Sequence, residues 1–131
     1  MFIKQSELIA LTEEAKTSSR LRMNQDLRTS SADCSQRMLN ALEPRTIMPI
    51  HRHRNTSETM VIVKGSLIER FYDDNGNVIE EILMKPAGDC AIVQIPAGQW
   101  HSLEVLESGT VIFEAKDGAY APLSEDDILI K

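Results

Sequence analysis

All three histidines of this chain fall within two short patterns that together describe a metal site. Residues 51–65 read HxHxxxxExxxxxxG, and residues 96–101 read PxGxxH. In a β-strand, residues i and i+2 point to the same face, so His51 and His53 can present two imidazoles side by side. His101 follows a Pro-Gly turn, as a neighbouring strand of an all-β fold would deliver it.

A carboxylate completes the predicted ligand set. Glu58 follows a polar stretch that reads as a turn, and it opens an apolar run suited to the next strand. Three neutral imidazoles and one carboxylate can hold one divalent transition metal and leave positions for water or a substrate. Fe, Mn, Ni, Cu and Zn all accept these ligands, so the sequence does not identify the metal. The predicted metal ligands are His51, His53, Glu58 and His101.

The same two patterns are those of the cupins, and the chain resembles the WbuC family of cupin-fold metalloproteins. The likeness covers most of residues 20–122 and is carried by RMN at 22–24, QRMLNALEP at 36–44, IPAGQWH at 95–101 and EAKDGAY at 114–120. The resemblance implies a cupin-type jelly-roll β-barrel around a metal. The family's name also suggests surface-polysaccharide biosynthesis, which is an analogy of family.

Three positions depart from these patterns. Arg45 stands where the general cupin pattern has Gly, and Val105 stands where it has Asn. Ser57 replaces an aromatic residue that is usual in WbuC relatives. None of the three removes a predicted ligand. The first two bear on turn geometry, and Ser57 bears on the wall of the pocket.

Hydrophobic periodicity predicts an all-β fold preceded by one short helix. Helical spacing of Leu8, Leu11 and Ala15 after an N-cap at Ser6 gives a helix over about residues 6–16. Strands are predicted over 20–27, 38–42, 46–53, 58–63, 67–72, 78–84, 90–95, 101–106 and 110–116. Such short strands with regularly spaced turns indicate a sandwich or closed barrel. We expect one cupin domain over 1–131, with a helical extension at 1–19, the barrel at 20–122 and a tail at 123–131.

The strand at 20–27 alternates apolar and polar residues, which alone fits a solvated sheet face equally well. The family resemblance favours the other possibility, in which Arg22 and Asn24 face the barrel cavity and contact a ligand. A guanidinium there would favour an anionic or carboxylate-bearing ligand. Tyr120 is a further candidate, as a gate at the mouth of the cavity.

The register of the strand at 110–116 is open. A three-residue loop before it would turn Glu114 outward, whereas a two-residue loop would bring Glu114 inward. We favour a solvated carboxylate. Alternation from His101 turns Trp100 outward, for packing or for a dimer contact.

Charge and hydropathy limit the partners. A net charge of −6 and a pI near 5.0, without clusters of Lys and Arg, argue against nucleic acid. No apolar stretch approaches the roughly 20 residues that span a bilayer, and the N-terminus lacks a signal-peptide core, so we expect no membrane partner and a cytoplasmic location. The apolar tail at 128–130 and an outward Trp100 predict a homodimer.

Two functional classes follow from the predicted site. In the first, the protein is a metal-dependent enzyme that acts on a small polar molecule such as a sugar or a carboxylate. In the second, it is a non-catalytic module that binds or senses such a molecule through the metal. A general acid or base beside the metal would discriminate the two, and the sequence places none there. The catalytic residues and the type of reaction therefore stay open.

Overall fold

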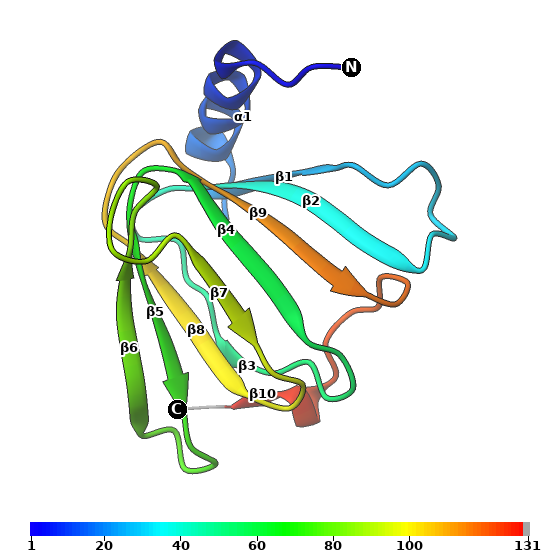
Figure 1. Ribbon diagram of the computed structural model, residues 1–131, viewed down its shortest axis with the longest axis vertical. Coiled ribbons are helices and arrows are strands. Elements are labelled where there is room, and N and C mark those ends of the chain that lie inside the picture. Colours follow the sequence, from blue (N-terminus) through cyan, green and yellow to red (C-terminus); the bar gives the residue numbers. More distant parts are fainter. Residues whose placement is uncertain (130–131) are drawn as a thin grey trace.

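Two antiparallel sheets and one helix make up the structure, a computed structural model that describes residues 1–129 (Figure 1). The first sheet has the order β1-β2-β9-β4-β7 and the second β10-β3-β8-β5-β6. The elements of the first sheet are β1 Arg22–Asp26, β2 Ser35–Leu42, β9 Thr110–Asp117, β4 Glu58–Lys64 and β7 Ile92–Ile95. Those of the second are β10 Ile128–Leu129, β3 Ile50–His51, β8 Trp100–Val105, β5 Leu67–Tyr72 and β6 Val78–Met84. The predicted all-β sandwich with an N-terminal helix is confirmed.

Helix α1 (Gln5–Thr17) covers the outer face of the first sheet (Figure 1). Its buried residues Leu8, Leu11 and Ala15 pack against Leu39, Ala41 and Val111 of β2 and β9. The helix begins one residue before the predicted N-cap. Lys4 is the N-cap, and its backbone N–H donates to the Glu7 carboxylate. No helix within residues 1–129 has both the length and the apolar character needed to cross a membrane.

The space between the sheets is apolar at one end. Its buried core consists of Leu42, Met60, Ile62, Leu67, Met84, Val105 and Ile112. Burying a side chain of this size contributes about 1.5–3 kcal/mol, so this cluster holds the two sheets together. Polar inward-facing residues occupy the next positions along the same strands, and the candidate site lies there.

Two turns show why particular residue types matter. A Cβ on Gly65, which has φ of 86°, would lie 2.2 Å from Thr110 Oγ1, so the end of the first pattern requires glycine. Arg45 adopts φ of 74°, in the left-handed region that glycine favours. Arg45 therefore adopts the turn conformation that a glycine would adopt at this position of the cupin pattern.

The C-terminal tail packs on its own chain. A 3₁₀ turn (Glu125–Asp127) leads into β10, which pairs with β3. Arg52 Nε and Arg54 Nη2 lie 3.1 and 3.0 Å from Asp127 Oδ1 and fasten this turn. Ile130, the last residue of the predicted apolar tail, lies outside the described residues.

Trp100 contacts its own chain as well. It is 6% exposed, its indole N–H donates to Asp74 at 3.1 Å, and the Arg52 guanidinium stacks on its ring at 4.3 Å. Trp100 and His101 are consecutive residues of β8 and point to opposite faces of the strand, so the predicted outward direction of Trp100 fits. The prediction that it forms exposed apolar surface is wrong, because Arg52 and Asp74 cover it. Trp100 therefore does not supply the surface on which the homodimer was predicted.

Candidate metal centre and its cavity

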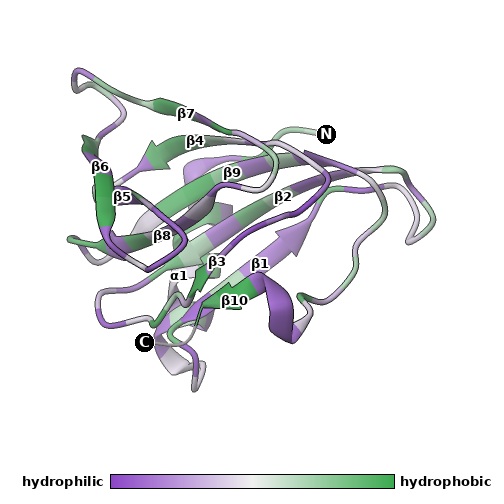
Figure 2. Ribbon diagram, turned by 90° about the horizontal axis from the view of Figure 1, so that it is seen from below, coloured by the Kyte–Doolittle hydropathy of each residue, from purple (hydrophilic) through white to green (hydrophobic). Residues whose placement is uncertain are grey.

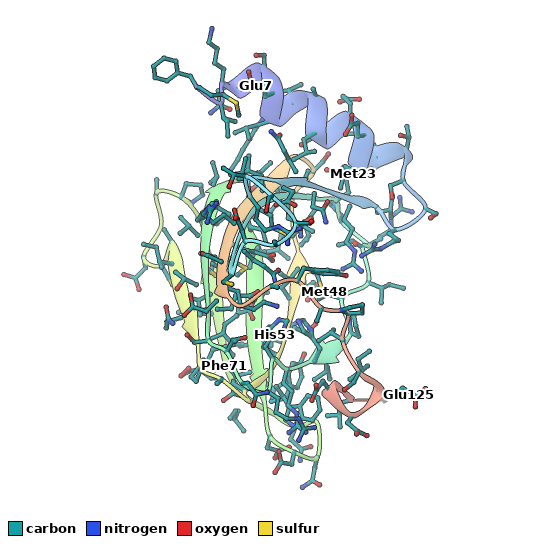
Figure 3. The ribbon with its side chains drawn as sticks, turned by 90° about the vertical axis from the view of Figure 1, so that its right-hand side faces the viewer. Glu7, Met23, Met48, His53, Phe71 and Glu125 are labelled. Carbon is teal, nitrogen blue, oxygen red and sulfur yellow. The ribbon has the colours of Figure 1, made fainter. Side chains whose placement is uncertain are left out.

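The three imidazoles come together at one point. His51 ends β3 and lies directly opposite His101 of β8, and His53 follows in the loop after β3. One ligand atom from each ring lies within 4.8 Å of the others. Ring centroids are 4.2 Å apart for His51 and His101, 5.3 Å for His51 and His53, and 5.7 Å for His53 and His101. In Figure 3, His53 lies among the strands in the middle of the molecule.

Glu58 approaches the imidazoles from the facing sheet, as the first residue of β4. Its Oε1 lies 3.6 Å from His101 Nε2, and its Oε2 lies 3.8 Å from His53 Nε2. Glu58 is 8% exposed. The structure thus brings all four predicted ligands together, from both sheets.

Backbone carbonyls orient two of the rings. His51 Nδ1 lies 2.8 Å from the Pro49 carbonyl oxygen, and His101 Nδ1 lies 2.9 Å from the Gln99 carbonyl oxygen. A ring that donates through Nδ1 keeps the Nε2 lone pair free, which is the usual second-shell arrangement of a metal-binding histidine. His101 Nε2 is buried without a hydrogen-bond partner among residues 1–129. This orphaned acceptor, beside a carboxylate and two more imidazoles, fits a divalent cation.

The protonation states also suit a metal. Burial lowers the pKa of His51 to about 4, helped by the neighbouring His101, and burial likewise lowers the pKa of His53 to about 4. Burial alone would raise the pKa of Glu58, but its interactions with the three imidazoles outweigh this effect and lower it. At neutral pH, His51 and His53 are therefore neutral and Glu58 is ionised, as metal ligands must be.

A cavity of about 320 Å³ opens onto the histidines. Arg22 and Asn24 of β1 line it together with the mostly exposed Tyr120. Met23, between the first two, turns the other way and packs against the helix side of the sheet (Figure 3). The alternation in β1 therefore directs the two predicted polar residues to the cavity. Their role as ligand contacts stays a prediction.

The Arg22 guanidinium has no carboxylate partner among the described residues. Its Nη1 lies 3.2 Å from the Met48 sulfur, a weak acceptor, and its Nε is buried without a partner. Burial lowers its pKa, and so does the nearby Arg20, whereas Glu114 acts in the opposite direction. Since a half-buried charge without an ion-pair partner is costly, this position favours an anion in the cavity.

The favoured solvated position of Glu114 is wrong. On β9, Glu114 lies between Met38 of β2 and Met60 of β4, on the face that lines the cavity. The pairing of β9 with β2 and β4 sets this register, since β8 belongs to the other sheet, and the strand pattern alone did not determine it. Burial raises the pKa of Glu114 to about 8, with a further increase from Glu58.

Two further cavity residues were not predicted. Lys116 pairs with Glu58 across the strands, and its Nζ lies 3.2 Å from His53 Nδ1. Glu69 of β5 is 2% exposed and lines the same cavity. A signal existed in the sequence, because Glu69 shares strand parity with the apolar Leu67 and Phe71.

We expect Glu69 to make the metal-free protein less stable at alkaline pH. Burial, with added repulsion from Glu58 and Glu114, raises the pKa of Glu69 to about 9. Between its unfolded pKa of about 4.3 and its folded pKa, the native state holds a proton that the unfolded state has lost, so the free energy of unfolding falls as pH rises.

Glu69→Gln removes this titration. The free energy of unfolding, measured by urea denaturation of chelator-treated protein at pH 5 and pH 9, should fall less for the variant than for the wild type. The difference should be at least about 1 kcal/mol, since each unit of pKa is worth about 1.4 kcal/mol. Glu80→Gln, at an exposed position on β6, is the control. Equal changes in wild type and Glu69→Gln would contradict the prediction.

Comparisons with known proteins agree with this architecture. The family model described as Domain of unknown function (DUF6016) matches residues 3–84. A search of curated proteins gives no match. The similar solved structures include the capsular polysaccharide assembling protein CapF from Staphylococcus aureus, with a TM-score of 0.66 and 23% identity over 81% of this chain. The match covers 30% of the CapF chain, so this chain spans about a third of its length.

Two more solved structures share the fold at lower identity. Oxalate oxidase in complex with the substrate analogue glycolate has a TM-score of 0.63 and 12% identity, over 83% of this chain and 57% of its own. The cupin domain of Cnp3 from Schizosaccharomyces pombe has a TM-score of 0.57 and 12% identity, over 76% of this chain and 65% of its own. These likenesses confirm the predicted cupin-type fold. None of them is to a WbuC protein, so that finer resemblance stays a prediction.

Proposed function

The chain belongs to the family described as Domain of unknown function (DUF6016), and we propose that it is a metal-binding cupin protein that binds a small polar molecule beside one divalent metal. The observation that carries the proposal is the convergence of His51, His53, Glu58 and His101, with a free Nε2 on His101 aimed at their common centre. These four residues would hold the metal. When bound, a divalent transition metal can polarise a carbonyl group or lower the pKa of water.

The walls of the cavity support an anionic ligand. Arg22 and Lys116 supply positive charge, and Asn24 offers an amide for hydrogen bonding. The pKa values of Glu69 and Glu114 are raised in the metal-free protein, which reduces the repulsion between these carboxyls and an anion. Oxalate oxidase, which shares the fold, is described in complex with glycolate, a small carboxylate. A carboxylate-bearing molecule therefore suits this cavity better than a neutral sugar.

The same carboxyls favour catalysis over simple binding. Discrimination between an enzyme and a sensing module depends on an acid or base near the metal. Glu114 lines the cavity, where the nearby Glu58 raises its pKa and Arg22 acts in the opposite direction. A protonated carboxyl in such a place can give a proton to a bound substrate and take it back. A metal-dependent enzyme is the class that we favour, with a binding module as the alternative.

A role in surface-polysaccharide biosynthesis is a further part of the proposal. It is supported by the resemblance to the WbuC family and by the fold shared with CapF, described as a capsular polysaccharide assembling protein. The shared fold spans about a third of CapF, so of all parts of the proposal the pathway has the narrowest support. A cytoplasmic location is proposed with it.

Elemental analysis tests the metal directly. Protein purified without a histidine tag should carry close to one transition-metal ion per chain, and the element found identifies the metal. A binding screen of small acids and sugars on the metal-loaded protein should then select carboxylates over neutral sugars. Protein that takes up no transition metal from a mixture of Fe, Mn, Ni, Cu and Zn would contradict the proposal.

We also propose a homodimer, formed through the edge at β6 and β7. Strand β6 is an edge strand, and the apolar residues exposed there are Val78, Ile79, Ile82 and Leu83, with Ile92 on β7. Much of β6 and β7 is coloured as hydrophobic in Figure 2. An exposed apolar edge strand is a surface that monomers usually avoid, because its unpaired backbone groups attract another strand.

Sedimentation tests the dimer. The wild type at micromolar concentration should sediment at twice the 14.7 kDa chain mass. The Ile79→Lys/Leu83→Lys variant should sediment as a monomer, because two charges would be buried in the interface. Ile47→Lys, at an 83% exposed position outside this edge, is the matched control and should stay dimeric. A wild-type monomer at micromolar concentration would contradict the dimer.

A further inference from the structure

Unpaired polar atoms are concentrated in the cavity. Within residues 1–129, the buried side-chain atoms without a hydrogen-bond partner are Thr12 Oγ1, Arg22 Nε, Glu69 Oε1 and His101 Nε2. All except Thr12, which lies on α1, line the cavity that contains the histidines, and Glu69 also lines a second cavity beside β6 and β7. Each buried polar atom left unpaired costs about 1–3 kcal/mol, and native proteins pair the great majority of them. The three unpaired atoms therefore indicate where a ligand of this cavity makes its contacts.

Glu69 lies at the floor of the cavity. On β5 it lies opposite Leu103 of β8 and Ile82 of β6. Its pair with Leu103 is the next inward-facing pair along the strands after Phe71 and His101. The next inward position on β5 is Leu67, which belongs to the apolar core. The carboxyl thus stands at the boundary between the core and the histidine cluster.

No structural role accounts for this carboxyl. Its side chain makes no hydrogen bond or ion pair with any residue that the structure describes, although Glu69 is 2% exposed. A leucine would fill the position without the desolvation penalty of an acid. The Glu69 side chain lines the cavity with its Oε1 unpaired. A carboxyl oxygen accepts a hydrogen bond, and a protonated carboxyl also donates one, so a hydroxyl group can pair with Glu69 in either protonation state.

Arg22 and Glu69 belong to opposite sheets, yet both line the cavity that contains the histidines. We propose that Glu69 hydrogen-bonds a hydroxyl group of the ligand while Arg22 binds a carboxylate of the same molecule. The ligand class is then a hydroxy-carboxylate, as opposed to a simple carboxylate or a neutral polyol. This inference rests on the proposed function and narrows it, and it makes Glu69 a specificity-determining residue.

Three six-carbon probes separate the two contacts. Gluconate carries a carboxylate and hydroxyls, hexanoate carries only the carboxylate, and sorbitol carries only hydroxyls. Each is titrated calorimetrically into protein loaded with Zn(II) and dialysed free of excess metal. The wild type should bind gluconate at least about tenfold more tightly than either other probe, because a tenfold change corresponds to about 1.4 kcal/mol, the size of one good hydrogen bond.

Variants of Glu69 assign that preference. Glu69→Leu should bring gluconate binding to within about threefold of hexanoate binding, with hexanoate binding and zinc content unchanged. Glu69→Gln should keep most of the preference, since an amide also donates and accepts. Glu107→Leu makes the same replacement at an exposed position in the turn before β9 and should behave as the wild type. The melting temperature of ligand-free Glu69→Leu should not fall, whereas loss of a structural carboxyl would lower it.

The possible results distinguish failure of this inference from failure of the proposed metal-binding function. If Glu69→Leu keeps the gluconate preference, or if wild type binds gluconate no better than hexanoate or binds neither, the inference is overturned while the metal site stands. Failure of the wild type to take up zinc or any other transition metal would overturn the proposed function itself. A melting temperature that falls in both Glu69→Leu and Glu69→Gln would assign Glu69 to the fold and also overturn the inference.

Discussion

The His51→Ala/His101→Ala variant should retain less than about a tenth of the wild-type metal content after dialysis against a weak chelator. Two of the four predicted ligands are then missing. The backbone carbonyls of Pro49 and Gln99, which orient the two imidazoles, also lose their partners. The variant should still fold, because the buried core of the sandwich contains neither histidine. Elemental analysis gives the metal content, and circular dichroism reports the fold.

A cavity residue outside the ligand set provides the control for this variant. Asn40 lines the same cavity but lies on β2, away from the four converging side chains, so Asn40→Ala should keep its metal. Full metal occupancy in the double variant would rule out the assignment of these ligands. Equal loss of metal in Asn40→Ala would attribute the effect to a disturbed cavity.

The Arg22→Ala variant should bind both gluconate and hexanoate roughly 10- to 100-fold more weakly than the wild type. A charge-assisted hydrogen bond to a carboxylate contributes about 1.5–3 kcal/mol, and both probes carry the carboxylate. Sorbitol binding and metal content should not change. Arg22 thus affects both acids, whereas Glu69 affects only the hydroxylated one, so the two residues are distinguished by the same titrations.

Arg37 offers the matched control for Arg22. It also lies on a strand of the first sheet, but it pairs with Asp33 at 3.3 Å and does not line the cavity. Arg37→Ala removes the same charge from the protein and should leave binding of the acids unchanged. Equal weakening by both substitutions would indicate a general effect of net charge, and unchanged binding in Arg22→Ala would contradict the proposed contact.

Much of the site could be predicted from the sequence because its determinants are local. The spacing of His51 and His53 follows from strand geometry, and Gly65 marks the turn that a side chain would block. The alternation in β1 that puts Arg22 and Asn24 on one face is likewise a local property, although it leaves open whether that face lines the cavity. These features depend on a few neighbouring residues, so short patterns carry them.

The rest depends on contacts between distant segments. Whether Glu114 faces the cavity is decided by the register in which β9 pairs with β2 and β4. The apolar tail resembles exposed surface until its pairing with β3 is known, and Figure 2 shows β10 as a hydrophobic strand at the edge of its sheet. Trp100 is covered by Arg52 and Asp74, which come from different parts of the chain. Strand alternation assigns each side chain to one of two faces of the sheet, but it does not say which other segments cover that face.

Crystals of the metal-loaded protein, measured at the absorption edge of the element found by elemental analysis, provide the most direct test of the metal site. We expect one anomalous peak per chain, with nitrogen of His51, His53 and His101 and oxygen of Glu58 at about 2.0–2.2 Å, the usual range for such bonds. A peak bound by other residues, or no peak among these four side chains in protein that carries one metal per chain, would contradict it.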